Sequence, residues 1–465
     1  MTLPRFFFVI VLCALAMPVF STASGQSRPP ATDREMRASY APVVKETAPA
    51  VVNIFTSRTV RTRSIFDDPF FSQFFGSRPG GRERTQSSLG SGVILDSSGL
   101  VVTNNHVIEG MEQIRVVLAD RREFVAEVLL ADPQTDLAVL QIAADEPLPT
   151  IAFADSDAAE VGDIVLAIGN PFGVGQTVSS GIVSALNRTN VSVSDFQFFI
   201  QTDAAINPGN SGGALVDVDG KLLGINTAIY SRSGGSNGIG FAIPGNLVQR
   251  LVASAARGEM MVRRPWLGVI GSDVDGRIAE AIGLDRPRGA LINRLYDNGP
   301  ADDAGLREGD VILSIDDQDI LDGEALRYRP ATLDEGETVN IRYLRDGRER
   351  QTRAKLAFPP ERPRANRTTL SGDHLLRGVT IANLSPALNE ELGRNPFDTG
   401  VVVLALDPRQ VSRRVPVRSG YLIQAINGQS TDNVGAVERA LRGGAITELI
   451  VKDTRGRSRS FRIAQ

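Results

Sequence analysis

Short runs of β-branched and other apolar residues, separated by turn signals, fill the stretch from about residue 45 to residue 250. Within residues 91–108, GVIL and LVVT read as two strands, and DSSG (residues 96–99) reads as the turn between them. One helix is predicted, near residues 245–257 and before Gly258. Many strands with almost no intervening helix favour a sandwich or a barrel over a parallel α/β sheet.

The last 200 residues carry an internal repeat. Two pairs of segments correspond: WLGVIGSDV (266–274) with LRGVTIANL (376–384), and AGLREGDVILSIDDQ (304–318) with VPVRSGYLIQAINGQ (415–429). Gly268 matches Gly378 and Gly309 matches Gly420, so the offsets are 110 and 111 residues. Two similar domains joined by a Pro-rich linker are therefore expected. Their predicted bounds are residues 262–358, 359–371 for the linker, and 372–465 for the more divergent second domain.

The N-terminus has the pattern of a secretory signal peptide. Arg5 precedes an uncharged apolar run at residues 6–20, and small residues follow at 21–25. The run is shorter than the roughly 20 residues that a spanning helix needs, and an uncleaved membrane anchor is the alternative. We predict a signal at residues 1–25, a polar lead at residues 26–44, and a periplasmic protein without an integral span once the signal is removed.

Composition excludes several classes of function. A formal net charge of -4 and a pI near 5.5 argue against a basic nucleic-acid binder. The single cysteine, Cys13, lies inside the predicted signal, so the mature chain has no cysteine nucleophile, Cys-based zinc site or iron–sulfur site. No GxxxxGK[ST] loop is present, which fits activity without ATP. We expect no cofactor and no metal.

One serine lies in a glycine frame, INPGNSGGAL, with Gly209 two residues before Ser211 and two glycines directly after it. Either the chain merely turns here, or another group must approach Ser211 and its backbone closely. A serine nucleophile needs a base and an orienting carboxylate. Taken singly, His106 is more often a structural residue at a strand end, and Asp136 a strand cap. Together with Ser211 they follow the order His, Asp, Ser of the chymotrypsin-like arrangement.

The glycine frame is explained if acyl transfer occurs there. Negative charge develops on the substrate carbonyl oxygen, and backbone N–H groups must point at it. Glycine at position 209 presents its amide with no side chain in the way. The backbone amides of Gly209 and Ser211 are the predicted oxyanion donors. The first two triad members are expected in one barrel and the serine in a second.

The chain resembles the HtrA (Deg, or Do-like) family of serine proteases. The resemblance is carried by GSGVILDSSGLVVTNNHVI, TDLAVL, AIGNPFGVGQTVSSGIVSAL, QTDAAINPGNSGGALVD and GIGFAIP, and the two repeats extend it almost to the C-terminus. It implies a mainly β fold, with a chymotrypsin-like double β-barrel protease domain (residues 45–258) followed by two PDZ domains. The family's catalytic triad falls on His106, Asp136 and Ser211.

The resemblance also places specificity and binding residues. Ala205, six residues before the nucleophile, would lie at the floor of the S1 pocket with Ile206 beside it, so small or medium aliphatic side chains are expected there. GINTA (224–228) resembles the strand that pairs with an extended substrate. Its candidate residues are Ile225, Asn226 and Thr227. The candidates for receiving a peptide C-terminus in the first PDZ domain are Arg264, Trp266, Leu267, Gly268 and Val269; an ordinary β-domain with Leu267 in its core is the alternative.

Assembly and regulation follow from the same resemblance. Residues 57–88 contain five phenylalanines within ten residues and match a long loop that reaches a neighbouring subunit, so homo-trimers or larger assemblies of trimers are implied. A flap folded on its own domain is the alternative. Peptide binding to a PDZ domain would order the loops at 187–196, 205–210 and 228–239. In the second repeat Tyr421 replaces the Asp found after the matching glycine of the first, so that domain is expected to serve assembly.

The predicted function is that of a serine endopeptidase that degrades unfolded or misfolded exported proteins without ATP, cuts after small or medium aliphatic residues, and has added chaperone activity. Unfolded proteins and C-terminal peptides are the expected partners. Two alternatives stand beside it: a PDZ-based chaperone or binding scaffold, and a regulatory protease with one specific target.

Overall fold

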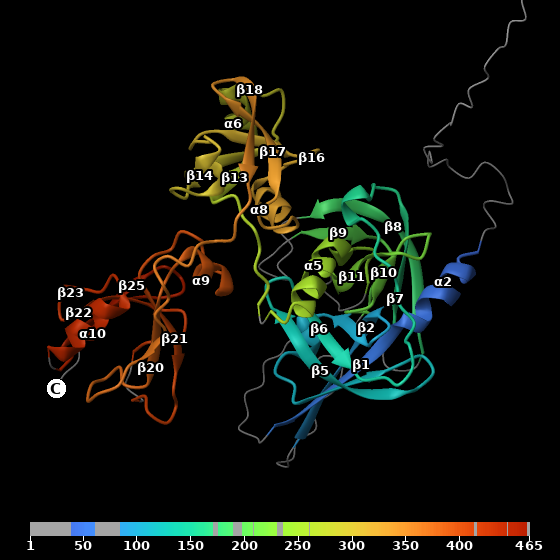
Figure 1. Ribbon diagram of the computed structural model, residues 1–465, viewed down its shortest axis with the longest axis horizontal. Helices are drawn as coiled ribbons and strands as arrows, with labels where there is room; N and C mark the ends of the chain where they lie inside the picture. The colour runs from blue at the N-terminus through green and yellow to red at the C-terminus, as the bar shows by residue number, and fades with distance from the viewer. Residues whose placement is uncertain are drawn as a thin grey trace, which may run out of the picture. The chain divides into compact units, whose positions relative to one another are not determined.

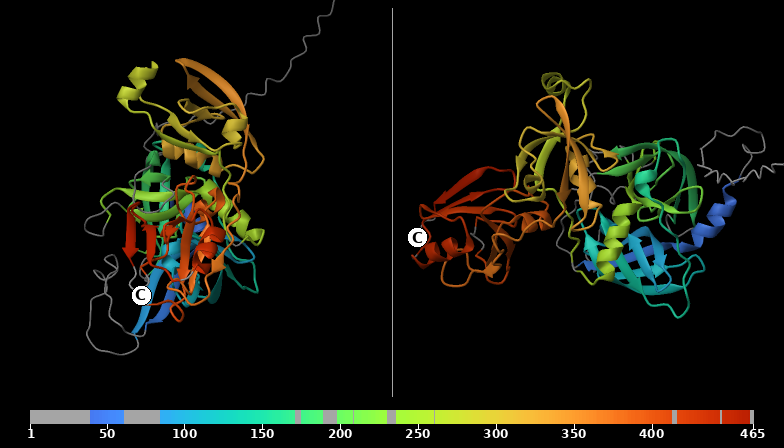
Figure 2. Two further views of the ribbon diagram at one scale, coloured as in Figure 1. Left: turned by 90° about the vertical axis from the view of Figure 1, so that its left-hand side faces the viewer. Right: turned by 45° about the horizontal axis from the view of Figure 1, so that its top comes forward.

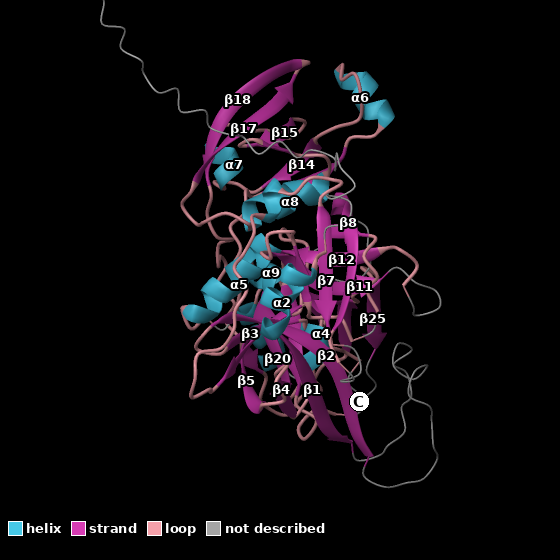
Figure 3. Ribbon diagram, turned by 90° about the vertical axis from the view of Figure 1, so that its right-hand side faces the viewer, coloured by secondary structure: helices cyan, strands magenta, loops and turns pink. Residues whose placement is uncertain are grey.

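The computed structural model describes residues 39–60, 84–170, 175–188, 198–207, 209–229, 236–259, 261–412, 416–443 and 445–462. The predicted signal peptide and most of the lead segment lie outside these residues. Strands dominate the described part, and the helices are short (Figure 3). The prediction of a mainly β chain is therefore confirmed.

The first barrel closes from six strands in the order β1-β2-β3-β6-β5-β4 (Figure 1). These strands are β1 (Val51–Val60), β2 (Arg84–Asp96), β3 (Leu100–Thr103), β4 (Gln113–Val117), β5 (Glu123–Asp132) and β6 (Leu137–Ile142). The expected strands GVIL and LVVT are the end of β2 and all of β3. Fully buried Ile54, Ile94 and Leu140 fill the interior. Helix α2 (Ala41–Thr47) and a short 3-10 turn, η1 (Ala48–Ala50), precede the barrel.

The second barrel also closes from six strands, in the order β10-β11-β12-β9-β8-β7. They are β7 (Ile164–Gly169), β8 (Thr177–Arg188), β9 (Phe199–Thr202), β10 (Ala214–Val216), β11 (Leu222–Ile229) and β12 (Gly240–Pro244). A 3-10 turn, η2 (Ser156–Ala158), precedes it, and the one-turn helix α4 (Asn105–Ile108) follows β3 in the first barrel. Two antiparallel six-stranded barrels are the chymotrypsin-like fold that was predicted.

The predicted helix is α5 (Gly245–Ala256), and it ends where Gly258 adopts a φ of +71°. Leu247, Val248 and Leu251 are buried along one side of it, at the spacing that puts residues on one helical face. The left-handed conformation of Gly258 is the usual way in which a helix ends, because glycine has no Cβ to clash there.

The two repeats fold into two small sheets (Figure 2). Their strand orders correspond, except that the second sheet has one additional edge strand. The first has the order β13-β14-β15-β17-β18, with β16 paired to β15. Its elements are β13 (Val269–Asp273), α6 (Gly276–Ile282), β14 (Ala290–Leu295), α7 (Pro300–Asp303), β15 (Val311–Ile315), β16 (Gln318–Asp319), α8 (Gly323–Ala331), β17 (Thr338–Arg345) and β18 (Arg348–Lys355).

The second repeat has the order β19-β20-β21-β22-β24-β25, with β23 paired to β22. Its elements are β19 (Thr368–Thr369), β20 (Val379–Asn383), α9 (Pro386–Glu391), β21 (Val401–Leu406), β22 (Leu422–Ile426), β23 (Gln429–Ser430), α10 (Val434–Arg442), β24 (Glu448–Lys452) and β25 (Ser458–Arg462). Helices α10 and α8 occupy equivalent places in the two repeats.

Two predicted boundaries differ from the structure. Residues 57–60 and 84–88 of the expected Phe-rich loop are strand, because β1 and β2 pair as far as Val60 and Arg84; the five phenylalanines lie outside the described residues. The expected linker already contains β19, whose Thr368 pairs with Ile381 of the second sheet. Helix α2 begins at residue 41, within the predicted lead segment of residues 26–44.

Candidate active site

His106 lies on the one-turn helix α4, directly after β3 has left the first barrel. Asn104 caps this helix in an extended conformation and is fully buried, which fixes where the turn begins. The side chain of His106 is 40% exposed, so its ring reaches solvent while its backbone is held against the barrel. A ring in this position is anchored at one edge and accessible at the other.

Asp136 lies in the turn between β5 and β6, where its φ is +57°. Asparagine and aspartate tolerate this left-handed conformation better than other residues with a Cβ. The carbonyl oxygen of Asp136 accepts hydrogen bonds from the Asn104 side chain (2.9 Å) and the Asn105 amide (3.1 Å). The His106 amide donates to Oδ1 of Asp136 at 2.9 Å. The turn and α4 therefore hold each other in place.

The carboxylate of Asp136 and the ring of His106 are directly bonded. Nδ1 of His106 lies 2.7 Å from Oδ2 of Asp136, and the carboxylate is buried. An ionised carboxylate can only accept, so Nδ1 carries the proton and Nε2 is left as the basic nitrogen. This fixed tautomer is what a general base requires.

Thr227 of β11 joins the aspartate to the serine. Its hydroxyl donates to Oδ2 of Asp136 at 2.8 Å, and its carbonyl oxygen accepts from the Ser211 hydroxyl at 3.0 Å. Among the described residues, the Ser211 hydroxyl makes this bond and none to His106. The triad candidates thus meet around Thr227. Nucleophile–base hydrogen bonds are often long or misdirected without substrate and tighten when it binds.

The glycines around Ser211 are required by close backbone packing. Gly212 has a φ of +84°, and a Cβ placed there would lie 2.1 Å from the carbonyl oxygen of Ser91. A Cβ on Gly213 would lie 2.3 Å from the carbonyl oxygen of Ile168. Ser91 holds the loop at two points, since its amide donates to the Ser211 carbonyl (2.8 Å) and its hydroxyl to the Gly209 carbonyl (2.6 Å). The frame is therefore more than a simple turn.

The two predicted oxyanion donors, the amides of Gly209 and Ser211, belong to half-buried residues. Gly209 has a φ of +96°, a conformation natural to glycine. The amides of Gly209 and Ser211 donate no hydrogen bond to any residue that the structure describes. They are thus the amides of this loop that a substrate oxygen could engage.

Replacing Gly212 with alanine is expected to lower the free energy of unfolding by about 2–4 kcal/mol, because strain at positive φ adds to the clash with Ser91. Gly238 is a matched control: its φ is +83°, but a Cβ there meets nothing within 4 Å. Gly238→Ala should lower stability by only about 1 kcal/mol. Urea denaturation of both variants measures the difference, and equal losses would contradict the packing explanation.

The two candidates for the S1 pocket, Ala205 and Ile206, differ in burial. Ala205 is exposed, and its carbonyl accepts from the Ser179 hydroxyl at 2.8 Å. Ile206 is only 1% exposed and packs in the core of the second barrel with Val165 and Leu215. Its side chain therefore belongs to the barrel interior. Asp203 is engaged elsewhere, because the amide of Ile182 donates to its carboxylate at 2.7 Å.

The prediction that Ile225 and Asn226 pair with substrate is wrong. Ile225 pairs with Ala214 on one side and Ile243 on the other, so both edges of the backbone are occupied within the barrel. Asn226 exchanges backbone hydrogen bonds with Gly212 and Gly213 and is fully buried. Thr227 is placed at the site, but in a role that the sequence did not reveal: it connects Asp136 and Ser211. A hydroxyl in the strand flanking the serine loop was the available signal.

The peptide-binding candidates of the first repeat do not all lie together, because Arg264 is held away from the other four. Arg264 is buried and pairs with Asp132 and Gln134, in the turn that leads to Asp136, so its guanidinium is engaged there rather than at a peptide carboxylate. The other candidates form the entry to β13. Trp266 donates its amide to Ala357, the carbonyls of Leu267 and Gly268 accept from Ala301 and Tyr296, and Val269 pairs with Leu295. Leu267 is buried, as the alternative interpretation expected, and α8 packs beside β13.

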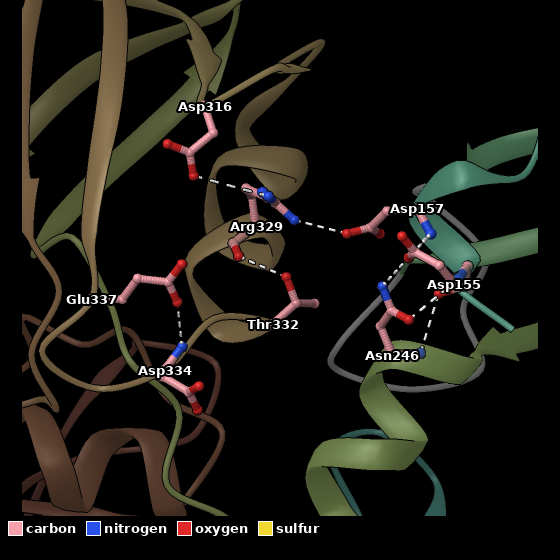
Figure 4. Close-up of polar contacts among 9 residues, drawn as sticks. Asp155, Asp157, Asn246, Asp316, Arg329, Thr332, Asp334 and Glu337 are labelled. Atoms are coloured by element: carbon pink, nitrogen blue, oxygen red, sulfur yellow. Dashed lines mark hydrogen bonds and ion pairs between the residues drawn. The ribbon is translucent and has the colours of Figure 1, made fainter. Parts of the chain in front are cut away.

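Helix α8 also contacts η2, the 3-10 turn that precedes the second barrel (Figure 4). Arg329 donates to the carboxylate of Asp157 at 2.7 Å, and Tyr328 stacks on Phe198 with ring centroids 3.5 Å apart. Burial raises the pKa of Asp157, and the charge of Arg329 opposes that rise. Phe198 directly precedes β9, the strand that leads toward the serine loop, so α8 lies between the entry of β13 and a segment connected to Ser211.

Within the ranges given above, no group of three or more His, Cys, Asp or Glu side chains could hold a metal ion. No helix in the same ranges is both long enough and apolar enough to cross a bilayer.

Comparison with known proteins identifies two kinds of domain in this chain. A model of the trypsin-like peptidase domain matches residues 90–225, and a model of the PDZ domain matches residues 265–356. The chain is 36% identical over 463 residues to the periplasmic serine endoprotease DegP of Escherichia coli (strain K12), covering 93% of this chain and 94% of that protein. It is 39% identical over 412 residues to a probable periplasmic serine endoprotease, DegP-like, of Marinomonas sp. (strain MWYL1), covering 85% and 86%.

A solved structure is also similar. The structure titled HtrA-type protease AlgW with decapeptide matches this chain with a TM-score of 0.52 and 46% sequence identity. The match covers 70% of this chain and 99% of the AlgW chain.

Proposed function

Because this chain belongs to the HtrA-type family of DegP serine endoproteases, we propose that it degrades unfolded exported proteins in the periplasm with His106, Asp136 and Ser211. The chain is a serine endopeptidase by family, and the assignment of its triad rests on one observation above all. That observation is the 2.7 Å hydrogen bond between His106 and the buried carboxylate of Asp136. Thr227 is hydrogen-bonded both to this carboxylate and to Ser211.

The proposed reaction follows from the protonation states. Nε2 of His106 takes the proton of the Ser211 hydroxyl as the oxygen attacks the substrate carbonyl. The imidazolium that forms is stabilised by the carboxylate of Asp136, and it then gives its proton to the leaving amine. The amides of Gly209 and Ser211 donate to the oxygen on which negative charge develops. Losing one such donor typically lowers the rate by roughly 10²–10³.

The proposed specificity is for small or medium aliphatic side chains. Ala205 supplies no charge at the position expected for the floor of S1, and Asp203 is turned to the Ile182 amide of β8. Fragments of an unfolded substrate, mapped by mass spectrometry, should therefore end mainly in Val, Ala, Ile or Leu. A majority of fragments ending in Lys or Arg would contradict this pocket assignment.

Unfolded proteins are the proposed substrates because the peptide bond to be cut must reach Ser211 in an extended segment of chain, which a folded protein seldom offers. Incubation of the protein and its Ser211→Ala variant with an unfolded, disulfide-free protein tests the proposal. Cleavage by the unmodified protein alone supports the protease. Equal suppression of aggregation by both supports added chaperone activity, and the absence of cleavage even with C-terminal peptides present would favour a binding scaffold. We also propose that the protein assembles into homo-trimers or larger assemblies of trimers, in which the Phe-rich segment contacts a neighbouring subunit.

Regulation by the first PDZ domain is proposed to pass through α8. A peptide C-terminus seated at Leu267, Gly268 and Val269 would lie beside this helix, whose other end contacts Asp157 and Phe198. The segments proposed to become ordered are residues 187–196, 205–210 and 228–239, of which 189–196, 208 and 230–235 lie outside the described residues. The second repeat, whose Tyr421 breaks the PDZ pattern, is proposed to serve assembly.

Replacing Arg329 with alanine is expected to reduce the activation produced by a C-terminal peptide at least about fivefold, the lower range of coupling energies between linked sites. The affinity for the peptide should stay unchanged, because Arg329 faces the barrel. Arg327→Ala is the control, since Arg327 lies on the same helix near Glu324. Cleavage rates with and without saturating peptide measure the effect, and undiminished activation in the Arg329 variant would overturn this route.

A further inference from the structure

The two repeats differ at one pair of facing positions. In the first repeat Asp310 precedes β15 and Arg345 ends β17, and both oxygens of Asp310 accept from the guanidinium at 2.6 Å. Arg345 also donates to the Gly305 carbonyl at 2.8 Å. The carboxylate is almost fully buried, so this two-bond ion pair closes the end of the sheet.

The second repeat exchanges both members of this pair. Val311 pairs with Leu344 in the first sheet, and Leu422 pairs with Lys452 in the second, so the register makes Tyr421 the counterpart of Asp310. It makes Asp453 the counterpart of Arg345. A phenol and a carboxylate cannot form the ion pair, and the end of this sheet is not closed by one.

Asp453 instead turns into its own hairpin. Its carboxylate accepts from the amides of Arg455 and Arg457, each at 3.0 Å, and from Nε of Arg459 at 3.1 Å. The hydrogen bond that the backbone amide of Arg457 donates is the main reason that the pKa of Asp453 lies below its usual value. This residue is therefore ionised at neutral pH, and it neutralises one arginine.

A cavity of about 560 Å³ occupies the place that the ion pair would close. Four arginines and two aromatic residues account for its chemistry: Arg418, Arg455, Arg457, Arg459, Tyr421 and Phe461. With Asp453 as the one acidic side chain of the lining, the formal charge is +3, in a chain whose net charge is -4. Arg418 and Arg455 form no ion pair with any residue that the structure describes. The cavity is thus suited to an anion that carries an apolar body.

An unpaired strand edge borders this cavity. β25 is the last strand in the order of the second sheet, with β24 as its one neighbour among the described strands. Arg459 and Phe461 lie two residues apart in β25, on the same face, and both line the cavity. A peptide that paired along β25 would place alternate side chains above the cavity, at a spacing of roughly 7 Å.

We propose that this cavity is a second peptide-binding site, which takes an extended acidic segment along β25, with its carboxylates among the arginines and an aromatic side chain on Tyr421 and Phe461. The site is distinct from the expected PDZ groove. That groove would lie at β20 and α10, by analogy with β13 and α8, and β20 is separated from β25 by three strands of the sheet. The proposal does not depend on catalysis, so it stands or falls separately from the proposed protease function.

The test uses the full chain with Ser211→Ala, which prevents cleavage. The probe is the peptide Glu-Glu-Phe-Glu-Glu, with an amidated C-terminus and a neutral dye, so that no terminal carboxylate can enter the PDZ groove. Fluorescence anisotropy at low salt should show binding, and about 0.5 M salt should abolish most of it, because the Debye length then falls to about 4 Å. The matching Gln-Gln-Phe-Gln-Gln peptide should bind at least about tenfold more weakly.

Arg418→Ser with Arg455→Ser should weaken binding of the acidic peptide at least about tenfold, since two charge-assisted contacts are removed. Arg462→Ser is the matched control, because Arg462 lies on the other face of β25 and should leave binding unchanged. Circular dichroism checks that each variant is folded. Equal binding of the two peptides, equal loss in the control, or binding of anionic phosphatidylglycerol vesicles in place of the peptide would overturn the proposal.

Discussion

Ser211→Ala is expected to lower kcat/KM for an unfolded protein substrate by about 10⁶-fold, because removal of the nucleophile leaves only binding and the oxyanion donors. The fold should persist, since the contacts that hold the loop are made by backbone atoms of residues 209, 211 and 212. Fluorescence of a dye-labelled unfolded substrate measures the rate. Unchanged circular dichroism and unchanged substrate affinity are the controls. A variant that retained even a hundredth of the rate would exclude Ser211 as the nucleophile.

Asp136→Asn is the second large effect, with an expected loss of about 10⁴-fold in kcat. An asparagine amide at this position donates to Nδ1 of His106, so the ring proton moves to Nε2 and the base is lost. The hydroxyl of Thr227 also loses its carboxylate partner. KM should change little, because the backbone of residue 136 still accepts from Asn104 and Asn105.

The control for this variant is Asp145→Asn, which removes an exposed carboxylate outside the site. It should leave kcat unchanged. Steady-state kinetics over a range of substrate concentrations separates kcat from KM. A loss confined to KM in Asp136→Asn would mean that Asp136 acts in substrate binding and does not orient the base.

The barrels could be predicted from the sequence because their strands alternate with unmistakable turns. The DSSG turn and the helix before Gly258 are found where they were expected. The strand ends could not be predicted where polar residues pair beyond the core, as in the register of Thr59 with Thr85. Strand β19 could not be predicted either, because a two-residue strand is defined by the strand it pairs with and not by its own composition.

The triad candidates could be predicted because each has a constraint that is visible locally: a strand end, a turn and a glycine frame. The role of Thr227 could not, because it depends on a hydrogen bond between residues 91 positions apart. Arg264 was misplaced for the same reason, since its partner Asp132 is 132 positions away. Ile225 and Asn226 have the right composition for a substrate strand, but only barrel closure shows that both of their edges are occupied.

The most direct test of the central claim is covalent labelling of the serine. The protein is treated with a fluorophosphonate, which reacts with a serine only where a neighbouring base activates it, and the modified peptide is identified by mass spectrometry. We predict stoichiometric labelling at Ser211, and at least about a 10³-fold slower reaction in His106→Ala. Labelling at another serine, or equal labelling without His106, would contradict the proposed triad.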